Sequence, residues 1–596
     1  MKRILLAFII AAAALPVSAQ QKTGIDYYFL GEYDKAVYYL QQSAETAESD
    51  YYLGEVAFAR KDRTKAEEYY NKALALDPGS MLAKVGLAKL MIGQDAKKAE
   101  AMFKEIEKNN RKSAPLAVAI GYAYLDNGMV SAAEKRVAEA KGYDKSYSRL
   151  YVLEGDILAA NKDSQTGAIT GAYEQAKYFD SQNLLPYMKL ALVYEPRTTS
   201  LAIENAEKAA AIDPSYPVPY GILGRIYTSN GRYPEAIEAL KKYFAAGVYT
   251  PSDVERIARA YYFGDPEKLG ISEEQKYAEA QKWVDEGLKQ EPSHFVLNRY
   301  KMYLDARLGN TETGIADAER FFAIRGGDAT YLPMDYTMYG TILKNAGRTH
   351  EAIEQYEKAI ALNPDLLETY DEAVSMARSI DDYNLGARYY ERMLEVKKRM
   401  DEDKYNNDRL VDINTLGNLY YQAGTLTTVE KHPELVDALM AEQAWEGRLI
   451  ADIDTLNADS LRSDKEYFSA GYRKYNLLRA ESLFSELVEL APESYTGYYY
   501  LARTNNALHP GNDGIQNGIP GEHYSKTVSV IDARDEETPM SSMMQRALKE
   551  GLGYLAYYHY MKDDTENAVK YATRLLELDP ENANAKAILE DIKSRK

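Results

Sequence analysis

The stretch GEVAFARKDRTKAEEYYNKALALDP, residues 54–78, decides the fold of this chain. A small residue begins it and an apolar residue follows three positions later. Ala, an aromatic residue, Ala and Pro then stand at offsets 12, 16, 19 and 24. The positions that carry the pattern are Gly54, Ala57, Ala66, Tyr70, Ala73 and Pro78. Small residues let two helices approach closely, larger ones fill the space around them, and proline cannot continue a helical hydrogen-bond ladder. The stretch therefore predicts a helical hairpin that ends at Pro78.

The same pattern returns about a dozen times along the chain. Residues 340–364 repeat it at Gly340, Leu343, Gly347, Ala352, Tyr356, Ala359 and Pro364. This unit resembles the tetratricopeptide repeat, a helix–turn–helix of 34 residues. The resemblance implies an all-α fold, a right-handed superhelical solenoid of about 13 stacked hairpins. A single hairpin is too small to bury its apolar face, so neighbouring hairpins must stack.

The first residues have the order of a secretory leader. Lys2 and Arg3 precede the apolar run Ile4–Leu15, and Val17-Ser18-Ala19 offers small residues before a cut at Gln20. We interpret residues 1–19 as a signal peptide, because an uncleaved anchor would need a longer apolar run. No later segment is apolar over the length of a membrane helix. We therefore expect an exported chain without an integral membrane segment, in the periplasm or associated with the outer membrane.

The remaining chain is expected to form two arrays of hairpins. The pattern pauses in the charged stretch 397–409, which suggests an N-terminal array over 20–400 and a C-terminal array over 401–596. Two insertions interrupt the second array, at 425–474 and 509–523. The first insertion contains helical patterns. We expect it to be structured, because a structureless loop of that length is uncommon in a compact domain. A polar helix over 581–596 should cap the array.

Composition narrows the possible functions. The net charge of −19 disfavours binding to nucleic acid, which requires a basic surface. The absence of cysteine excludes disulfides, thiol catalysis, Cys-ligated metals and a lipid anchor on an N-terminal cysteine. Tyrosine is abundant, with 53 residues against 12 Phe and 2 Trp. Most tyrosines stand at repeat positions that should pack helices together, since the ring is apolar and its tip is polar.

No motif argues for catalysis or for a cofactor. The six histidines form no metal-binding spacing, and neither a phosphate-binding loop nor a nucleophile elbow is present. The glycine-rich stretch between His509 and His523 could hold a metal, but its spacing fits no standard calcium loop and favours a flexible insertion. We therefore expect no enzyme activity, no cofactor and no bound metal.

The resemblance implies a concave groove lined by the first helix of each repeat. Carrying over the groove positions gives a set of aromatic, charged and amide side chains: Tyr51, Glu55, Phe58, Tyr122, Arg225, Arg259, Tyr262, Lys344, Asn418, Tyr421, Tyr499, Arg503 and Asn506. Tyr and Arg dominate binding hot spots. Tyr51 and Tyr262 could instead pack on neighbouring helices. The two-carboxylate clamp of chaperone-binding members is not evident, since Asn414 and not Lys precedes Asn418.

Taken together, these features predict a non-catalytic scaffold or adaptor of the periplasm or cell envelope. It would bind a protein or peptide partner in the groove. A chaperone-like or assembly factor is an alternative within the same class. A glycan-binding envelope protein is another, although Trp283 and Trp445 are the only tryptophans. A hydrolase hidden in the insertions is a third, but carboxylate pairs are common by chance among 91 acidic residues.

Overall fold

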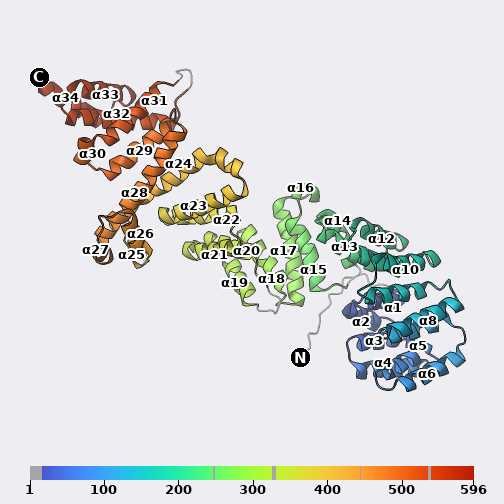
Figure 1. The fold of residues 1–596 in the computed structure, drawn as a ribbon. Helices are drawn as coiled ribbons and strands as arrows, with labels where there is room; N and C mark the ends of the chain where they lie inside the picture. The colour runs from blue at the N-terminus through green and yellow to red at the C-terminus, as the bar shows by residue number, and fades with distance from the viewer. Residues whose placement is uncertain (1–16, 246–247, 325–329, 443, 535–538, 596) are drawn as a thin grey trace. The chain divides into compact units, whose positions relative to one another are not determined.

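The computed structural model describes residues 17–245, 248–324, 330–442, 444–534 and 539–595. Within these ranges every regular element is a helix and no strand occurs (Figure 1). The helices up to residue 323 are α1 (Val17–Phe29), α2 (Tyr33–Gln42), α3 (Ala47–Ala59), α4 (Arg63–Leu76), α5 (Met81–Met91), α6 (Ala96–Asn109), α7 (Ala114–Leu125), α8 (Val130–Tyr143), α9 (Ser148–Ala160), α10 (Thr166–Phe179), α11 (Leu184–Tyr194), α12 (Thr199–Ile212), α13 (Pro217–Ser229), α14 (Tyr233–Ala245), α15 (Pro251–Phe263), α16 (Pro266–Leu269), α17 (Glu273–Gln290), α18 (Phe295–Leu308) and α19 (Thr311–Ala323). The later helices are α20 (Pro333–Asn345), α21 (Thr349–Leu362), α22 (Leu367–Ser379), α23 (Tyr383–Met400), α24 (Glu402–Leu426), α25 (Pro433–Ala441), α26 (Ala444–Asp452), α27 (Ala458–Ser463), α28 (Lys465–Leu490), α29 (Tyr495–Leu508), α30 (Asn512–Asn517), α31 (Ile519–Asp532), α32 (Ser542–Met561), α33 (Thr565–Leu578) and α34 (Ala583–Ser594).

Successive helices pack as hairpins, as the repeat predicts. The packed pairs are α1 with α2, α3 with α4, α5 with α6, α7 with α8, α9 with α10, α11 with α12, α13 with α14, α15 with α17, α20 with α21, α22 with α23, α24 with α28, α29 with α31 and α32 with α33. The first helix of a following hairpin packs on the second helix of the previous one, as α5 does on α4. The fold is therefore an all-α solenoid of stacked hairpins, which confirms the expected fold class.

The turns between hairpins use the residue before proline. Asp77 Oδ1 accepts a hydrogen bond from the Gly79 amide at 2.8 Å, and Asp213 Oδ1 accepts one from the Ser215 amide at 3.0 Å. Such a bond from a short acidic side chain to the backbone two residues later stabilises a tight turn. The Asp-Pro pairs of the sequence thus form the turns that reverse the chain between repeats.

The chain divides into two compact units. The first unit contains Met1–Leu308 with Ala316–Ala329, and the second contains Gly309–Ile315 with Thr330–Lys596. The charged stretch 397–409 suggests instead a boundary between the two arrays after residue 400. That position lies inside the second unit, in the turn between α23 and α24, and these two helices pack on each other. The limits of 20–400 and 401–596, as parts that fold separately, stay a prediction.

The insertion at 425–474 is helical and has its own small core. Its helices α25, α26 and α27 pack with the first turns of α28, and Trp445 is only 1% exposed among Val436, Leu449 and Phe468. Helix α24 pairs with α28 across this insertion, as the pattern of small and large residues predicted. The stretch 509–523, expected as an elongated turn, contains α30 and the beginning of α31.

The leader falls mostly outside the described residues. Residues 1–16 lie there, and Val17–Ala19 form the beginning of α1. Among the helices that the structure describes, none combines the length and the apolar character needed to cross a membrane.

Candidate partner-binding groove

The first helices of successive hairpins line two neighbouring cavities in the first unit. One cavity, of about 400 Å³, is lined by residues of α1, α3, α5, α7, α9 and α11, and we call it the Tyr51 cavity. The other, of about 790 Å³, is lined by α1, α3, α7, α9, the first residues of α2 and α4, and adjoining turns, and we call it the Asp126 cavity. Tyr28, Phe29 and Tyr122 line both. The face formed by the first helices is therefore hollowed, as the resemblance implied for a groove.

Four of the residues predicted for the groove come together here. Tyr51 and Glu55 line the Tyr51 cavity, Phe58 lines the Asp126 cavity, and Tyr122 lines both. Tyr51 also packs against Tyr70 with 5.9 Å between ring centroids, and it is only 5% exposed. Tyr51 thus packs on its own hairpin and also borders a cavity, so the packing role and the groove position expected from the sequence are compatible.

Glu55 has a structural role that sequence reasoning missed. It is 2% exposed and accepts hydrogen bonds from Tyr70 Oη at 2.6 Å and from Lys89 Nζ at 2.8 Å. Lys89 also donates to Asp126 Oδ2 at 2.5 Å, and its ammonium lies 4.3 Å from the Phe58 ring centroid. Burial raises the pKa of Asp126, although the charge of Lys89 opposes this. Glu55 is therefore occupied by its own chain and is not free for a partner.

A second buried carboxylate repeats this arrangement. Asp156 follows Gly155 in α9, as Glu55 follows Gly54 in α3. It accepts hydrogen bonds from Tyr173 Oη at 2.6 Å, from Lys189 Nζ at 2.9 Å and from Tyr122 Oη at 3.0 Å. In both cases a tyrosine of the second helix and a lysine of a later first helix satisfy the carboxylate. Tyr122 is thereby held at the wall of both cavities.

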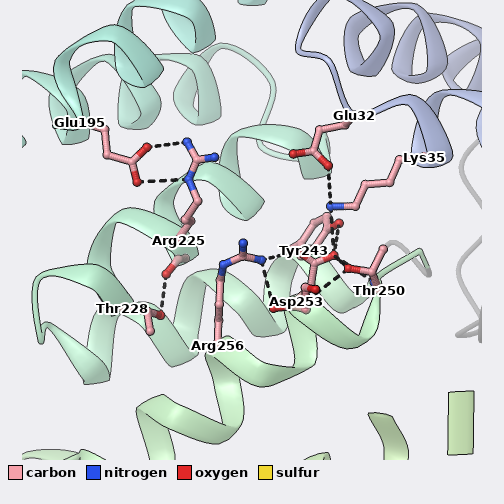
Figure 2. Close-up of polar contacts among 11 residues, drawn as sticks. Glu32, Lys35, Glu195, Arg225, Thr228, Tyr243, Thr250, Asp253 and Arg256 are labelled. Atoms are coloured by element: carbon pink, nitrogen blue, oxygen red, sulfur yellow. Dashed lines mark hydrogen bonds and ion pairs between the residues drawn. The ribbon is translucent and has the colours of Figure 1, made fainter. Parts of the chain in front are cut away.

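The third cavity of the first unit lies between the first hairpin and α11 to α15. It measures about 320 Å³, and we call it the Lys35 cavity. Figure 2 shows Lys35 of α2 reaching Asp253 of α15, with 3.0 Å between Nζ and Oδ2. Arg256 contacts the other oxygen of Asp253 at 2.7 Å. Because Lys35 and Asp253 are nearly buried, this ion pair connects the beginning of the array to its eighth hairpin.

Arg225, another predicted groove residue, lines the Lys35 cavity. Its guanidinium forms a two-pronged pair with Glu195, with Nε–Oε1 at 3.1 Å and Nη2–Oε2 at 2.5 Å (Figure 2). A further contact joins the first hairpin to α13, since Tyr216 Oη donates to Asp26 Oδ2 at 2.7 Å. Burial raises the pKa of Asp26, and the hydrogen bond from Tyr216 opposes this rise. The first unit thus curves until its first hairpin contacts residues about 200 positions later.

The two predicted residues of α15 differ in exposure. Arg259 is exposed, whereas Tyr262 is 4% exposed and packs against Tyr277, Tyr300 and Tyr303. Tyr262 thus has the packing role that was the alternative to a groove position.

In the second unit, three predicted residues form one cluster. Arg503 lies over the rings of Tyr421 and Tyr499, 5.1 and 5.6 Å from their centroids. Its Nε lies 3.2 Å from Glu550 Oε1, and Tyr499 Oη donates to Glu550 Oε2 at 2.9 Å. Burial and the charge of Glu550 raise the pKa of Tyr499. This cluster resembles the carboxylate networks of the first unit.

The other three predicted residues of the second unit do not take part in the contacts between Arg503 and Glu550. Lys344 Nζ pairs with Glu372 at 2.8 Å, and Asn418 donates to the Asn414 carbonyl at 2.8 Å. Asn506 is exposed. The role of the thirteen predicted positions in binding stays a prediction.

Several residues that shape the cavities carry no sequence signal. Lys35 and Asp253 line the Lys35 cavity and Arg149 lines the Tyr51 cavity, although nothing in the repeat pattern distinguishes them from the other charged residues of the chain. In the parts of the chain that the structure describes, no cluster of three metal-ligating side chains occurs. His509 Nδ1 lies 2.7 Å from Asp513 Oδ2.

A solenoid of hairpins whose first helices line a hollow face belongs to the class of helical-repeat scaffolds. Models of the tetratricopeptide repeat match residues 51–80, 219–245 and 336–366. These ranges contain most of α3 and all of α4, most of α13 and all of α14, and most of α20 and all of α21. The chain therefore contains tetratricopeptide repeats at these three places. Repeats of this kind typically form non-catalytic scaffolds for interactions between proteins. No curated protein sequence matches the chain.

Several solved structures are similar to the chain at low identity. The C-terminal part of a TPR repeat-containing protein from Cytophaga hutchinsonii is 22% identical over 61% of this chain and 98% of its own, with a TM-score of 0.30. A tetratricopeptide repeat protein from Parabacteroides merdae is 15% identical over 44% of this chain and 98% of its own, with a TM-score of 0.29. MamA from Desulfovibrio magneticus is 20% identical over 30% of this chain and 95% of its own, with a TM-score of 0.26.

Proposed function

We propose that the chain is a non-catalytic scaffold of the cell envelope that binds a protein or peptide segment on the hollow face of its first unit. The observation that carries this proposal is the pair of cavities lined by first helices. The Asp126 cavity, at about 790 Å³, is within the size range of binding pockets, and the Tyr51 cavity, at about 400 Å³, is near its lower end. A partner bound there would contact several repeats at once.

The physical properties of this face suit a peptide. Its aromatic residues Tyr28, Phe29 and Tyr122 offer apolar area with few rotatable bonds, so little side-chain entropy is lost on binding. The contacts of Asp26 with Tyr216 and of Lys35 with Asp253 hold the curvature in place. Such preorganisation lowers the entropic cost of association.

The proposal can be tested by photo-crosslinking in cells. Tyr33 lines the Asp126 cavity, whereas Tyr178 lies on the second helix α10 and is 82% exposed. A benzophenone amino acid in place of Tyr33 should crosslink a partner that mass spectrometry identifies. The same amino acid in place of Tyr178 is the matched control and should give no such product. Crosslinking of the same protein from both positions, or from neither, would contradict a partner site on the hollow face.

The number of captured proteins distinguishes the two forms of the scaffold. One stoichiometric partner from the envelope fraction supports a dedicated adaptor. Many partners at low occupancy support a chaperone-like role, in which the same face would hold different segments.

A further inference from the structure

Arg149 is a cavity-lining cation without a carboxylate partner. Its Nη1 lies 3.3 Å from Tyr52 Oη, and its guanidinium lies 5.3 Å from the Phe29 ring centroid. Among the described residues, no carboxylate oxygen lies within 4.0 Å of its nitrogens. Arg225 and Arg136 of the same unit both have such partners.

The nearest acidic side chains are engaged elsewhere. Glu48, which also lines the Tyr51 cavity, accepts a hydrogen bond from Gln21 Nε2 at 2.7 Å. Asp26 accepts a hydrogen bond from Tyr216 Oη at 2.7 Å. Glu55 is neutralised by Lys89. The guanidinium therefore remains available to a group that enters the cavity.

The backbone adds positive potential at the same place. The cavity is bordered by residues in the first turns of five helices: Glu48 of α3, Met81 of α5, Pro115 of α7, Arg149 of α9 and Leu185 of α11. The start of a helix carries a partial positive charge, and its first amides lack intrahelical acceptors. The side chains of Thr46, Ser80, Ser113 and Asn183 cap α3, α5, α7 and α11. Tyr147, the residue before α9, gives that helix no side-chain cap. A negatively charged group is favoured where such helix ends converge.

The remaining wall of the cavity is apolar or aromatic. Tyr51, Tyr52, Leu116 and Val152 belong to it. A small inorganic anion would leave this surface unfilled. A carboxylate that is attached to an apolar side chain or a short chain segment would match both the cation and the wall.

We propose that the Tyr51 cavity binds a carboxylate of the partner, adjacent to an apolar side chain, with Arg149 as the residue that recognises the charge. This inference rests on the proposed function, because it names the chemistry of the segment that the hollow face takes. A planar guanidinium can donate two parallel hydrogen bonds to a carboxylate, which a lysine cannot do.

Selection from a random heptapeptide library on the full chain tests the proposal. We expect enriched peptides to carry Asp, Glu or a free C-terminus beside an aromatic or aliphatic residue. Enriched peptides are then synthesised with a C-terminal acid or amide, and with Glu replaced by Gln, so that the source of the carboxylate is identified. Arg149→Met should weaken binding of the acidic form roughly tenfold to hundredfold and that of the neutral form little.

Matched variants separate charge recognition from folding. Arg149→Lys keeps the charge and should restore only part of the affinity, whereas Arg197→Met, at an exposed turn of the same unit, should leave affinity unchanged. Circular dichroism checks that each variant is folded. Enriched peptides without a carboxylate, or acidic peptides that bind Arg149→Met as tightly as the original chain, would overturn this inference and leave the proposed function standing. If no peptide is enriched, the proposed function itself fails.

Discussion

At the scale of single residues, the repeat depends on glycines that face tyrosine rings. A Cβ atom on Gly54 would lie 2.4 Å from Tyr70 Cε1, and one on Gly86 would lie 2.6 Å from the same ring. Tyr70 is fully buried between these two first helices. Gly155 and Tyr173 repeat the arrangement at 2.3 Å. The motif therefore requires glycine at these positions, because the adjacent tyrosine ring leaves no room for a Cβ atom.

We expect Gly54→Ala to destabilise the first unit by about 1–3 kcal/mol, because the new methyl group must displace the Tyr70 ring from a packed core. Gly171→Ala is the matched control, since Gly171 is exposed in the middle of α10 and a Cβ atom there would have no neighbour within 4 Å. It should be neutral or stabilise by up to about 1 kcal/mol, because alanine favours the helix. Urea unfolding measures both, and equal effects would contradict the ring-contact explanation.

At the scale of elements, the first hairpin is attached to α15 by a buried charge. Burial by itself raises the pKa of Asp253, but the charges of Lys35 and Arg256 hold it below its usual value of 3.8. Burial lowers the pKa of Lys35, yet the charge of Asp253 outweighs this and raises it above 10.5. The stabilisation is thus complete between these values. It is lost as the pH falls through the lowered pKa of Asp253, and as the pH rises through the raised pKa of Lys35.

Asp253→Asn should weaken this attachment by about 2–3 kcal/mol at pH 7. The loss is smaller than for an isolated buried ion pair, because Glu32 still lies 3.7 Å from the Lys35 ammonium and partly balances its charge. Hydrogen–deuterium exchange of the α1 and α2 amides measures the effect as faster local opening. The difference from the original chain should begin to shrink as the pH falls below about 4, the pKa of an unfolded aspartate, and should disappear below the lowered pKa of Asp253 in the folded chain.

Glu204→Gln is the control for this experiment, because Glu204 pairs with Lys208 on the exposed face of α12. Its exchange should differ little from that of the original chain, since exposed ion pairs contribute little. A difference at Asp253→Asn that does not change with pH would show that packing, and not charge, holds the hairpin.

At the scale of the whole molecule, the expected leader overlaps the first helix. The predicted cut between Ala19 and Gln20 lies within α1, and Thr23 Oγ1 donates to the Ala19 carbonyl at 2.7 Å. A helix hides its peptide bonds in its own hydrogen bonds. If the leader is removed there, we expect removal to precede the folding of α1.

We predict that the chain recovered from a periplasmic extract begins at Gln20. Ala19→Leu should block removal, because a large side chain does not suit the position before the cut. Mass spectrometry of the N-terminal peptide measures the outcome in both cases. The control Ala44→Leu, between α2 and α3, should leave processing unchanged. An intact N-terminus in the original chain would contradict the proposed export.

The sequence alone predicts those features of the structure that depend on contacts between residues close together along the chain. Gly54, Tyr70 and Pro78 lie within one hairpin, so their spacing was sufficient to predict two packed helices and the turn after them. The pairing of α24 with α28 across an insertion also followed, because Gly417 and Phe484 keep their repeat positions. The helices α30 and α31 were missed, since glycine and proline in 510–521 resemble a turn. Here neighbouring helices outweighed local propensity.

The sequence by itself determined the all-α repeat architecture, because a motif of about 34 residues records contacts between positions close along the chain. Only the tertiary structure decided which side chains border the hollow face. Contacts such as Lys35 with Asp253 and Asp26 with Tyr216 join positions about 200 residues apart. They depend on the small rotation that each hairpin adds to the one before. That rotation accumulates over the array and appears in no single repeat, so the spacing of the motif did not predict that the first hairpin contacts α15.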